Sequence, residues 1–291
     1  MSNDTCVIAI DAGTTGVRSR AVFVDGRPAV AAYREFTQHY PQPGWIEHDA
    51  QEIWEAVVAT LQQVIDEAGR DNVAAIGITN QRETVLAWSR STGQPHGTAI
   101  VWQDRRTAAR CDELEADGHL DLVRRQTGLV LDPYFSGSKI EWLLRERDIP
   151  VDGDLALGTI DTWIIWNLTG GDVHATDVTN ASRTMLYNIV ERKWSPELCD
   201  LLHVPIAALP EVRPSSGRFG LTADTSGVTS GIPVSGVAGD QQAALFGQGC
   251  VEPGQAKNTY GTGCFLLVNT GQERVRSEAG LLTTLACDPQ G

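Results

Sequence analysis

The sequence predicts an α/β fold built on a mixed β-sheet, and three observations carry this prediction. Three strand-like segments, at 5–12, 18–24 and about 28–37, precede the first long helix. That helix, at about 49–68, leads directly into a short apolar strand at 73–79. The order β-β-β-α-β does not alternate strictly, so the chain does not begin with a dinucleotide-binding Rossmann unit.

The first two strands are joined by a turn rich in glycine and threonine, Asp-Ala-Gly-Thr-Thr-Gly at 11–16. Its glycines let the backbone turn tightly and approach a ligand closely. The hydroxyls of Thr14 and Thr15, with the N–H groups of the turn, can donate to phosphate oxygens. Asp11 lies at the end of the strand, where it can hold Mg²⁺, usually through water. The alternative interpretation is an ordinary hairpin with an acidic turn.

The first helix has start and stop signals at its two ends. Asp49 and Glu52 resemble a capping box, and Gly69 is placed to end the helix. Between them, apolar residues repeat at helical spacing: Ile53, Val57, Leu61 and Val64. A crossover rich in proline and glycine, at 40–45, connects the third strand to this helix.

The middle of the chain contains further predicted strands, helices and loops. Strands are expected at 84–89 and 99–102, and helices at about 105–117, 120–126, 138–147 and 161–168. The segment 210–233, rich in Ser, Thr, Gly and Pro, is expected to form loops and short strands. A strand at 232–237 then ends at Gly239-Asp240, and a helix begins at Gln241. Near the end, a glycine loop at 260–263 precedes an apolar run at 264–268. This repeats the strand-and-glycine-turn pattern near residue 11, which indicates two related halves.

Composition limits the partners and the cellular location. The net charge of −14 over 291 residues argues against nucleic acid or an anionic membrane surface as partner. No apolar run is long enough for a transmembrane helix, and no basic region opens a signal peptide, so we expect a cytoplasmic protein. The six cysteines and six histidines are scattered, which predicts free thiols and no histidine metal site.

The positive charges of the chain are almost all arginine. Of its 23 lysines and arginines, only Lys139, Lys193 and Lys257 are lysine. An acidic, lysine-poor surface suits a protein that stays solvated in high salt, and so predicts a halophile-like cytoplasm. A genomic bias toward arginine codons is the alternative explanation.

Three segments carry side chains suited to binding a small polyol. Arg82 and Glu83 follow the strand ending at Thr79, where the guanidinium can donate to and the carboxylate accept from neighbouring hydroxyls. Trp102 can form an apolar wall for a carbon skeleton, and Tyr134 places a hydroxyl just ahead of a helix. The alternatives are a solvated charged turn, a core tryptophan and a structural tyrosine.

Asp240 and Gln241 occupy a strand-to-helix junction and form the second strong signal. A carboxylate there can take a proton from a hydroxyl while the amide holds a neighbouring hydroxyl. Phosphoryl transfer needs mainly positioning, charge stabilisation and such a carboxylate near the attacking oxygen. The alternative is that Asp240 only caps the helix. Met185 and Leu186 are expected to be packing residues.

Eight motifs in sequence order resemble the glycerol kinases of the FGGY carbohydrate kinase family: 11–15, 43–48, 77–84, 102–107, 132–136, 179–185, 239–247 and 257–264. The resemblance implies the ribonuclease-H-like fold of the actin, Hsp70 and sugar kinase superfamily. It also implies ATP-dependent phosphorylation of glycerol to sn-glycerol 3-phosphate, with ATP/ADP and Mg²⁺ as nucleotide and metal.

The resemblance also implies roles for individual residues. Asp240 would be the general base, Asp11 would support Mg²⁺, and Trp102 would pack on the carbons of glycerol. Glycerol would be bound by Arg82, Glu83, Tyr134, Asp240 and Gln241. The nucleotide phosphates would be contacted by Thr14, Thr15, Gly16 and Arg18, and the nucleotide by Thr262 from the second glycine loop.

The chain departs from the family pattern in several places. Ala12 and Gly16 stand where many relatives carry Gln and Ser. The loop at 221–233 lacks the Gly/Arg pattern with which some relatives bind fructose 1,6-bisphosphate, so we expect no inhibition by that sugar. We expect residues 1–249 to be the N-terminal, polyol- and phosphate-binding domain and 250–291 to be the truncated beginning of a second domain. Such a fragment is expected to expose an apolar face and to have little activity alone.

Other functions stay open. A different FGGY kinase, such as a xylulokinase, would share the fold, although Arg82-Glu83 with Trp102 and Tyr134 favours the smaller triol. A non-catalytic fragment could bind glycerol and transfer nothing. An actin-like filament protein would share the phosphate loops but would not need a polyol pocket. Assembly into a homo-oligomer is also possible from the sequence.

Overall fold

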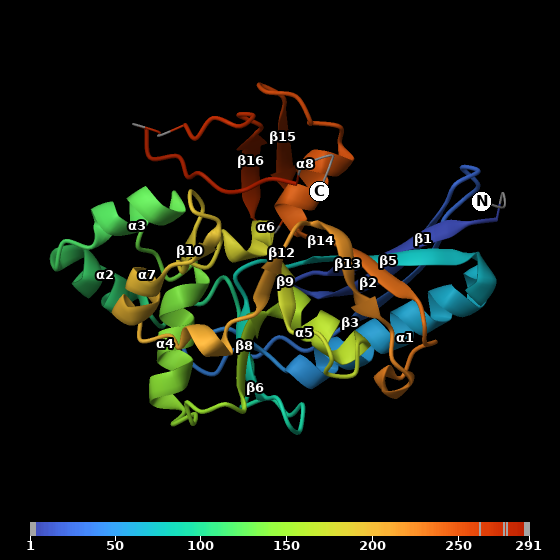
Figure 1. Cartoon of the computed structure of the whole chain (residues 1–291), viewed down its shortest axis with the longest axis horizontal. Helices are drawn as coiled ribbons and strands as arrows, with labels where there is room; N and C mark the ends of the chain where they lie inside the picture. The colour runs from blue at the N-terminus through green and yellow to red at the C-terminus, as the bar shows by residue number, and fades with distance from the viewer. Residues whose placement is uncertain (1–3, 262, 276, 278, 288–291) are drawn as a thin grey trace.

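The computed structural model describes residues 4–261, 263–275, 277 and 279–287, and its centre is a six-stranded mixed sheet (Figure 1). The strand order is β13-β14-β5-β1-β2-β3. The strands are β1 (Cys6–Ala12), β2 (Gly16–Phe23), β3 (Val30–Glu35), β5 (Val73–Asn80), β13 (Ser216–Leu221) and β14 (Pro233–Gly239). All three predicted N-terminal strands and the strand after the first helix are confirmed.

Strand direction within this sheet brings three strand ends together. The β1–β2 and β2–β3 pairs are antiparallel, whereas β5 is parallel to both β1 and β14. The carboxyl ends of β1, β5 and β14 therefore lie at one edge, which is where α/β sheets usually bind ligands. The β-β-β-α-β order and this mixed pairing confirm the ribonuclease-H-like prediction.

Helix α1 (Ala50–Ala68) covers one face of the sheet, below it in Figure 1. Its N-cap is Asp49, whose carboxylate accepts from the N–H groups of the second and third residues of the helix. The Glu52 carboxylate accepts from the Thr37 N–H at 2.8 Å, so it ties the helix to the segment that follows β3 rather than completing a capping box. At the other end Gly69, with φ 84°, donates its N–H to the Ile65 carbonyl, as the sequence predicts.

Burial alternates along the first strands because one face meets α1 and the other does not. Ile8, Ile10 and Ala12 are fully buried. On the opposite face Val7 is 44% exposed, and Val22 in β2 is 54% exposed. Val7 and Val22 are paired across β1 and β2, so they form a small exposed apolar spot at this end of the two strands.

A smaller antiparallel sheet and a cluster of helices lie beside the central sheet. Its order is β4-β7-β6-β8, formed by β4 (Glu47–His48), β7 (Ala99–Ile100), β6 (Val85–Ser89) and β8 (Leu155–Thr159). Strand β8 was not predicted, because all five of its residues are buried and it lacks the alternating pattern that marks a half-exposed strand. The helices in this region are α2 (Ala108–Ala116), α3 (Leu120–Thr127), α4 (Ser136–Glu146) and α7 (Pro196–Leu201). Helix α5 (Ile160–Leu168) instead joins α1 in the hydrophobic core of the central sheet.

Shorter elements connect the two sheets to the end of the chain. They are the 3₁₀ turns Arg70–Asn72, Ile206–Ala208 and Asp224–Ser226, with β9 (Ala175–Asp177), α6 (Val178–Ala181), β10 (Tyr187–Asn188), β11 (Lys193–Trp194) and β12 (Glu211–Arg213). Helix α8 (Asp240–Gly247) follows β14 directly, close to the predicted start. The hairpin of β15 (Ala256–Tyr260) and β16 (Cys264–Val268) lies at the top of Figure 1, where Tyr260 and Leu266 are 79% and 68% exposed.

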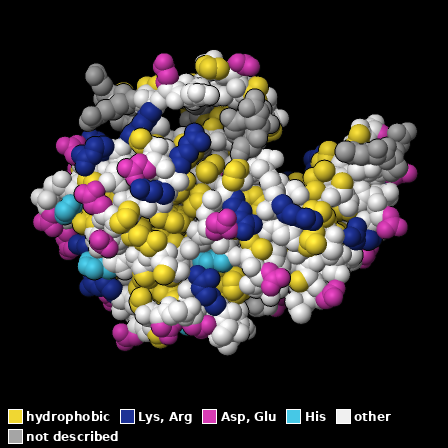
Figure 2. Space-filling model, in the orientation of Figure 1, with side chains coloured by type: hydrophobic (Ala, Val, Ile, Leu, Met, Phe, Trp, Pro, Cys, Tyr) yellow, Lys and Arg dark blue, Asp and Glu magenta, His cyan; other side chains and the backbone are white. Residues whose placement is uncertain are grey.

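Among the residues that the structure describes, and on the face in Figure 2, the charged side chains and the cysteines are distributed without clustering into a basic patch or into disulfides. Figure 2 shows acidic and basic side chains interspersed over one face, rather than a continuous basic patch. The six cysteines are free thiols. Within the described part of the chain, no helix is long and apolar enough to cross a membrane. Met185 and Leu186 are fully buried core residues, as expected.

Candidate functional site

A pocket of about 190 Å³ lies at the edge where the three strands end. Its lining contains every residue predicted to bind the polyol, with one threonine of the first glycine loop. The lining residues are Thr14, Gln81, Arg82, Glu83, Trp102, Tyr134, Asp240, Gln241, Thr259, Gly261, Gly263 and Phe265. Segments separated by up to 251 positions thus meet in one small, polar cavity.

Arg82 lies at the centre of this pocket. Its side chain is 4% exposed, and its Nε lies 2.9 Å from Oδ1 of Asp240, as an ion pair without hydrogen-bond alignment. Its two terminal nitrogens donate to Gln242 Oε1 at 3.2 Å and to Tyr134 Oη at 3.4 Å. The interpretation of Arg82-Glu83 as a solvated turn is therefore wrong, since both side chains are buried against the pocket.

Glu83 is held in an unusual conformation beside it. Its φ is 62°, in the left-handed region that non-glycine residues rarely adopt and that clusters at functional sites. The Glu83 carboxylate accepts from Arg183 Nε at 2.6 Å, and both side chains are buried. Sequence reasoning did not select Arg183, although it belongs to the 179–185 motif, because nothing along the chain shows that it faces Glu83.

Aromatic rings form the apolar wall of the pocket. Trp102 meets Tyr134 and Phe265 edge-on, with ring centroids 5.7 and 6.2 Å apart. Trp102 is half-buried and lines the cavity, so the core interpretation of this tryptophan is wrong. Burial raises the pKa of Tyr134 to about 12, so its hydroxyl stays protonated and can donate. Phe265 was not predicted, because it reads as one residue of an apolar strand.

The backbone that carries Tyr134 is fastened from within the core. Lys139 is fully buried, and its Nζ donates to the carbonyls of Pro133, Tyr134 and Phe135 at 2.9, 2.7 and 2.9 Å. A lysine ammonium has three donors, which matches three carbonyl acceptors. One of the three lysines of the chain is therefore used to shape the loop that lines the pocket.

Asp240 opens helix α8 and faces the pocket. The N-cap of the helix is Gly239 and makes no side-chain hydrogen bond, so the interpretation of Asp240 as a simple cap is wrong. Its side chain is 39% exposed, and its carboxylate accepts from the N–H and the side-chain amide of Gln241 at 2.7 and 3.2 Å. The Gly239 N–H donates to the Thr179 hydroxyl at 2.8 Å, which fixes the end of β14.

Gly239 is required by the close approach of Arg82. A Cβ placed on Gly239 would lie 2.5 Å from Cδ and 2.7 Å from Cγ of Arg82. On the other side of the junction, Lys257 donates to Gln241 Oε1 and, at 2.6 Å, to Thr259 Oγ1. The amide of Gln241 is thus oriented by a second lysine, from β15.

The first glycine loop is closed by its own backbone and by the neighbouring strand end. The Gly13 N–H donates to the Gly16 carbonyl at 3.0 Å, while the Gln81 side chain donates to the Gly13 carbonyl at 3.1 Å. Gln81 was not predicted as a site residue. Thr14 lines the pocket, whereas Thr15, Gly16 and Arg18 belong to the same loop and to β2 and lie outside the pocket lining. Thr262 lies outside the described residues.

A buried histidine, His48, contacts the side chain of Gln81. His48 contacts Gln38 Oε1 through Nε2 at 2.7 Å and Gln81 Nε2 through Nδ1 at 3.2 Å. Burial lowers the pKa of His48 to about 4, so the ring is neutral near neutral pH. The chain Gln38–His48–Gln81 therefore reaches the Gly13 carbonyl of the loop.

Asp11 can contribute to a magnesium site, although not by itself. It is opposite Arg18 in the β1–β2 pairing. Burial, and then the carboxylate of Asp240, raise its pKa, as expected when two acids face one space. Among the described residues no group of three or more His, Cys, Asp or Glu side chains could hold a metal. Mg²⁺ commonly takes only one or two protein carboxylates, with water and phosphate as its other ligands, so Asp11 is of the type that it binds.

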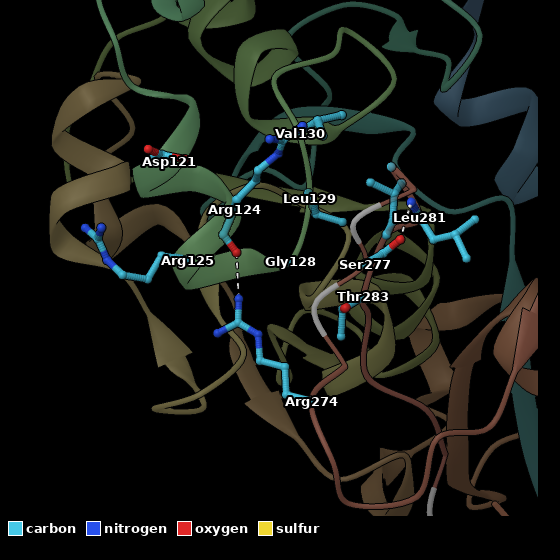
Figure 3. A pocket seen from close by; sticks show the side chains of 12 residues that line it. Asp121, Arg124, Arg125, Gly128, Leu129, Val130, Arg274, Ser277, Leu281 and Thr283 are labelled. Atoms are coloured by element: carbon cyan, nitrogen blue, oxygen red, sulfur yellow. Dashed lines mark hydrogen bonds between the residues drawn. The ribbon is translucent and has the colours of Figure 1, made fainter. Parts of the chain in front are cut away.

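A larger hollow of about 910 Å³ lies elsewhere, between α3 and a set of residues near the end of the chain, Arg274, Ser277 and 280–283 (Figure 3). Arg274 reaches across it to donate to the Arg124 carbonyl at 2.6 Å. In Figure 3 the side chain of Arg125 points away from this segment, so the charged groups do not converge on one point. None of the predicted site residues lines it, and the smaller pocket is the stronger functional candidate.

Comparisons with known proteins identify the family of the chain. Residues 6–247 match the N-terminal domain of the FGGY family of carbohydrate kinases. A glycerol kinase of Aeromonas salmonicida is 54% identical over 98% of this chain and 58% of its own length. A glycerol kinase of Shewanella frigidimarina is 56% identical over 96% of this chain and 57% of its own length. The chain thus spans less than two thirds of the curated relatives it matches.

Solved structures give the same result for the fold. A crystal structure of Plasmodium falciparum glycerol kinase with ADP superposes with a TM-score of 0.91 at 37% identity, covering 96% of this chain and 57% of that one. A xylulose kinase of Lactobacillus acidophilus superposes with a TM-score of 0.82 at 20% identity, over 90% of this chain and 54% of that one. The second likeness shows the fold alone.

Proposed function

Because the chain belongs to the FGGY family of carbohydrate kinases, we propose that it forms the glycerol- and phosphate-binding part of a glycerol kinase. The observation that carries this proposal is the pocket at the strand ends. It combines donors and acceptors for adjacent hydroxyls, from Arg82 and Glu83, with an aromatic wall and a carboxylate. The similarity to glycerol kinases over nearly the whole chain supports it.

The pocket is suited to hold a small triol. Arg82 and the Gln241 amide can donate to hydroxyl oxygens, and Glu83 and Asp240 can accept from the hydroxyls. Trp102 and Phe265 offer flat apolar surfaces to the carbon atoms. The cavity of about 190 Å³, with Phe265 in its lining, is large enough for a three-carbon polyol.

Asp240 is the residue placed to act as general base. As a terminal hydroxyl oxygen of glycerol attacks the γ-phosphorus of ATP, the Asp240 carboxylate takes its proton, and the bond to the ADP leaving oxygen breaks. The products are glycerol 3-phosphate and ADP. Arg82, paired with Asp240 at 2.9 Å, holds this carboxylate beside the pocket that both residues line.

The nucleotide would lie with its phosphates along the first glycine loop. Thr14, Thr15, Gly16 and Arg18 are the phosphate contacts of this proposal, with Thr262 from the second loop. Mg²⁺ would be held at Asp11 through water and would neutralise charge on the transferred phosphoryl group. The division at 249/250, the cytoplasmic location and the absence of inhibition by fructose 1,6-bisphosphate remain predictions.

Calorimetric titration tests this proposal directly. We expect the 291-residue chain to bind glycerol and to bind D-xylulose at least tenfold more weakly. Glu83→Gln should weaken glycerol binding, while Glu146→Gln, at the end of α4, should not. Tighter binding of D-xylulose would favour a different FGGY kinase, and no binding of either polyol would contradict the proposal.

A further inference from the structure

Tyr33 continues a row of side chains that crosses the first three strands beside the glycine loop. Asp11 is opposite Arg18 in the β1–β2 pair, and Arg18 is opposite Tyr33 in the β2–β3 pair. Residues directly opposite one another in antiparallel strands project from the same face of the sheet. The Tyr33 side chain is 48% exposed, so this face presents it to solvent next to the proposed magnesium and phosphate residues.

The hydroxyl of Tyr33 occupies the space that a side chain at position 16 would fill. A Cβ placed on Gly16 would lie 2.7 Å from Tyr33 Oη and 2.8 Å from its Cζ. The Arg34 carbonyl would lie 2.6 Å from the same Cβ. Real Cβ atoms do not come this close to other heavy atoms, so glycine at position 16 is what admits the tyrosine hydroxyl to the loop.

Two neighbours hold the tyrosine ring in this place. Its hydroxyl lies 3.4 Å from the Thr15 hydroxyl, at the upper limit of a hydrogen bond. The guanidinium carbon of Arg18 lies 5.4 Å from the centre of the ring, within the range of a cation–π contact. Tyr33 therefore contacts the side chains of two residues proposed to bind phosphate and fills the side-chain space of a third.

A phosphate group at this loop needs donors, because its oxygens only accept. A phenol hydroxyl donates one hydrogen bond, and bonds to an ionised acceptor are stronger than bonds between neutral groups. The contact between the Tyr33 and Thr15 hydroxyls is long, so either group can turn its proton toward an anion placed between the loop and Arg18.

We propose that Tyr33 is a phosphate-binding residue, whose hydroxyl enters the first glycine loop through the space left by Gly16. It donates there to a phosphate oxygen of the nucleotide, together with the Thr15 hydroxyl and the Arg18 guanidinium. This inference rests on the proposed function, because it takes the loop to bind nucleotide phosphates. It adds β3 to the elements that bind them.

Titration of the 291-residue chain with pyrophosphate and with ADP, each with Mg²⁺, tests the inference. Tyr33→Phe removes only the hydroxyl and keeps the ring against Arg18. We expect this variant to bind both ligands roughly tenfold more weakly. Its glycerol affinity and its thermal midpoint should match those of the unaltered chain, which a merely structural role would not predict.

Two further variants separate the possible failures. Tyr40→Phe removes the hydroxyl of another exposed tyrosine and should leave all affinities unchanged. Arg18→Ala tests the loop itself and should weaken pyrophosphate binding. If Arg18→Ala weakens binding and Tyr33→Phe does not, the inference is overturned and the proposed function stands. If the unaltered chain binds neither pyrophosphate nor ADP, the phosphate-binding role of the loop fails and the inference fails with it.

Discussion

The indole Nε1 of Trp102 donates a hydrogen bond to the hydroxyl of Thr14 at 3.0 Å. Trp102 is the apolar wall of the proposed polyol pocket, and Thr14 belongs to the loop proposed to bind phosphate. The Thr14 hydroxyl accepts from the indole, which leaves its own proton free to be donated toward a phosphate oxygen. One hydrogen bond therefore joins the two halves of the candidate site, although 88 positions separate the residues.

This bond predicts energetic coupling between the two halves. Trp102→Phe and Thr14→Val each remove it, so their effects on glycerol affinity in the presence of pyrophosphate should not add. We expect a coupling energy of about 0.5–1.5 kcal/mol in a double-mutant cycle measured by calorimetry. In a second cycle Thr15→Val replaces Thr14→Val. The Thr15 hydroxyl faces Tyr33, so the effects of Trp102→Phe and Thr15→Val on glycerol affinity should add. Additivity in both cycles would show that the bond carries no binding energy.

Asp240→Asn should separate binding from transfer. In a version of the protein extended to the length of its relatives, we expect the turnover number to fall by about 10²–10⁴-fold, because the amide cannot accept the proton. Glycerol affinity should change little, since asparagine has the same shape. Asp66→Asn, on the exposed face of α1, serves as the control. Near-normal turnover of Asp240→Asn would exclude Asp240 as the base. The 291-residue chain alone is expected to show little phosphotransfer.

Arg183→Ala should destabilise the protein and weaken glycerol binding. It leaves the Glu83 carboxylate buried without the partner at 2.6 Å, a change that costs about 3–5 kcal/mol in other proteins. Chemical denaturation and glycerol titration measure the two effects. Lys193→Ala breaks an ion pair of exposed side chains with Glu191 and should cost less than about 1 kcal/mol. Equal losses in both variants would mean that Arg183 has no special role.

Gly239→Ala tests the packing of the strand end against Arg82. The added Cβ would lie 2.5 Å from Cδ of Arg82, so the guanidinium must move away from Asp240. We expect a loss of about 1–3 kcal/mol in unfolding free energy, as in other overpacked cores, and weaker glycerol binding. At Gly247, at the end of α8, an added Cβ would meet no atom within 4 Å apart from its chain neighbours and its own helix backbone, so Gly247→Ala should be neutral or slightly stabilising. Tight glycerol binding by Gly239→Ala would contradict the argument.

Because the pKa of His48 is lowered in the folded protein, we expect the unfolding free energy to fall on acidification. Its pKa is about 4 in the folded protein, against an ordinary value of 6.5. Between these values the unfolded chain binds a proton that the folded protein does not, so stability falls as the pH falls through this window. One such group changes the unfolding free energy by up to about 1.4 kcal/mol per pH unit.

His48→Gln should therefore flatten the dependence of unfolding free energy on pH between about 6.5 and 4. Buried His174, with a pKa also lowered to about 4 by burial, keeps contributing to the slope in both proteins. Buried Asp161 has its pKa raised to about 6 and acts in the opposite direction, so the comparison between variant and parent isolates His48.

The sequence predicted most of the central sheet because its signals are local. Alternation along β1 and β2, the Asp49 cap and the Gly69 stop all act within a few residues of where they stand. Strand β8 was not predicted, because complete burial removes the alternation of apolar and polar residues that marks a half-exposed strand. Its conformation is decided by pairing within the small sheet.

The site residues show the same contrast between local and long-range signals. Arg82, Glu83, Trp102, Tyr134, Asp240 and Gln241 could be selected from motifs, and all of them line one pocket. Arg183, Gln81 and Phe265 could not, because each acts through a partner that is distant along the chain. Nothing in the sequence around these residues marks them as site residues. Their role follows from the fold, which places them against Glu83, Gly13 and Trp102.

The sequence by itself determined which residue types stand at the strand ends, and therefore the chemistry on offer: a carboxylate, a guanidinium, an amide and a glycine loop. Only the tertiary structure decided how they are oriented. It set Glu83 at φ 62°, placed the Trp102 indole on Thr14 and put the Tyr33 hydroxyl beside Gly16. The physical reason is that hydrogen bonds and steric exclusion act over a few ångströms of space, whatever the separation along the chain.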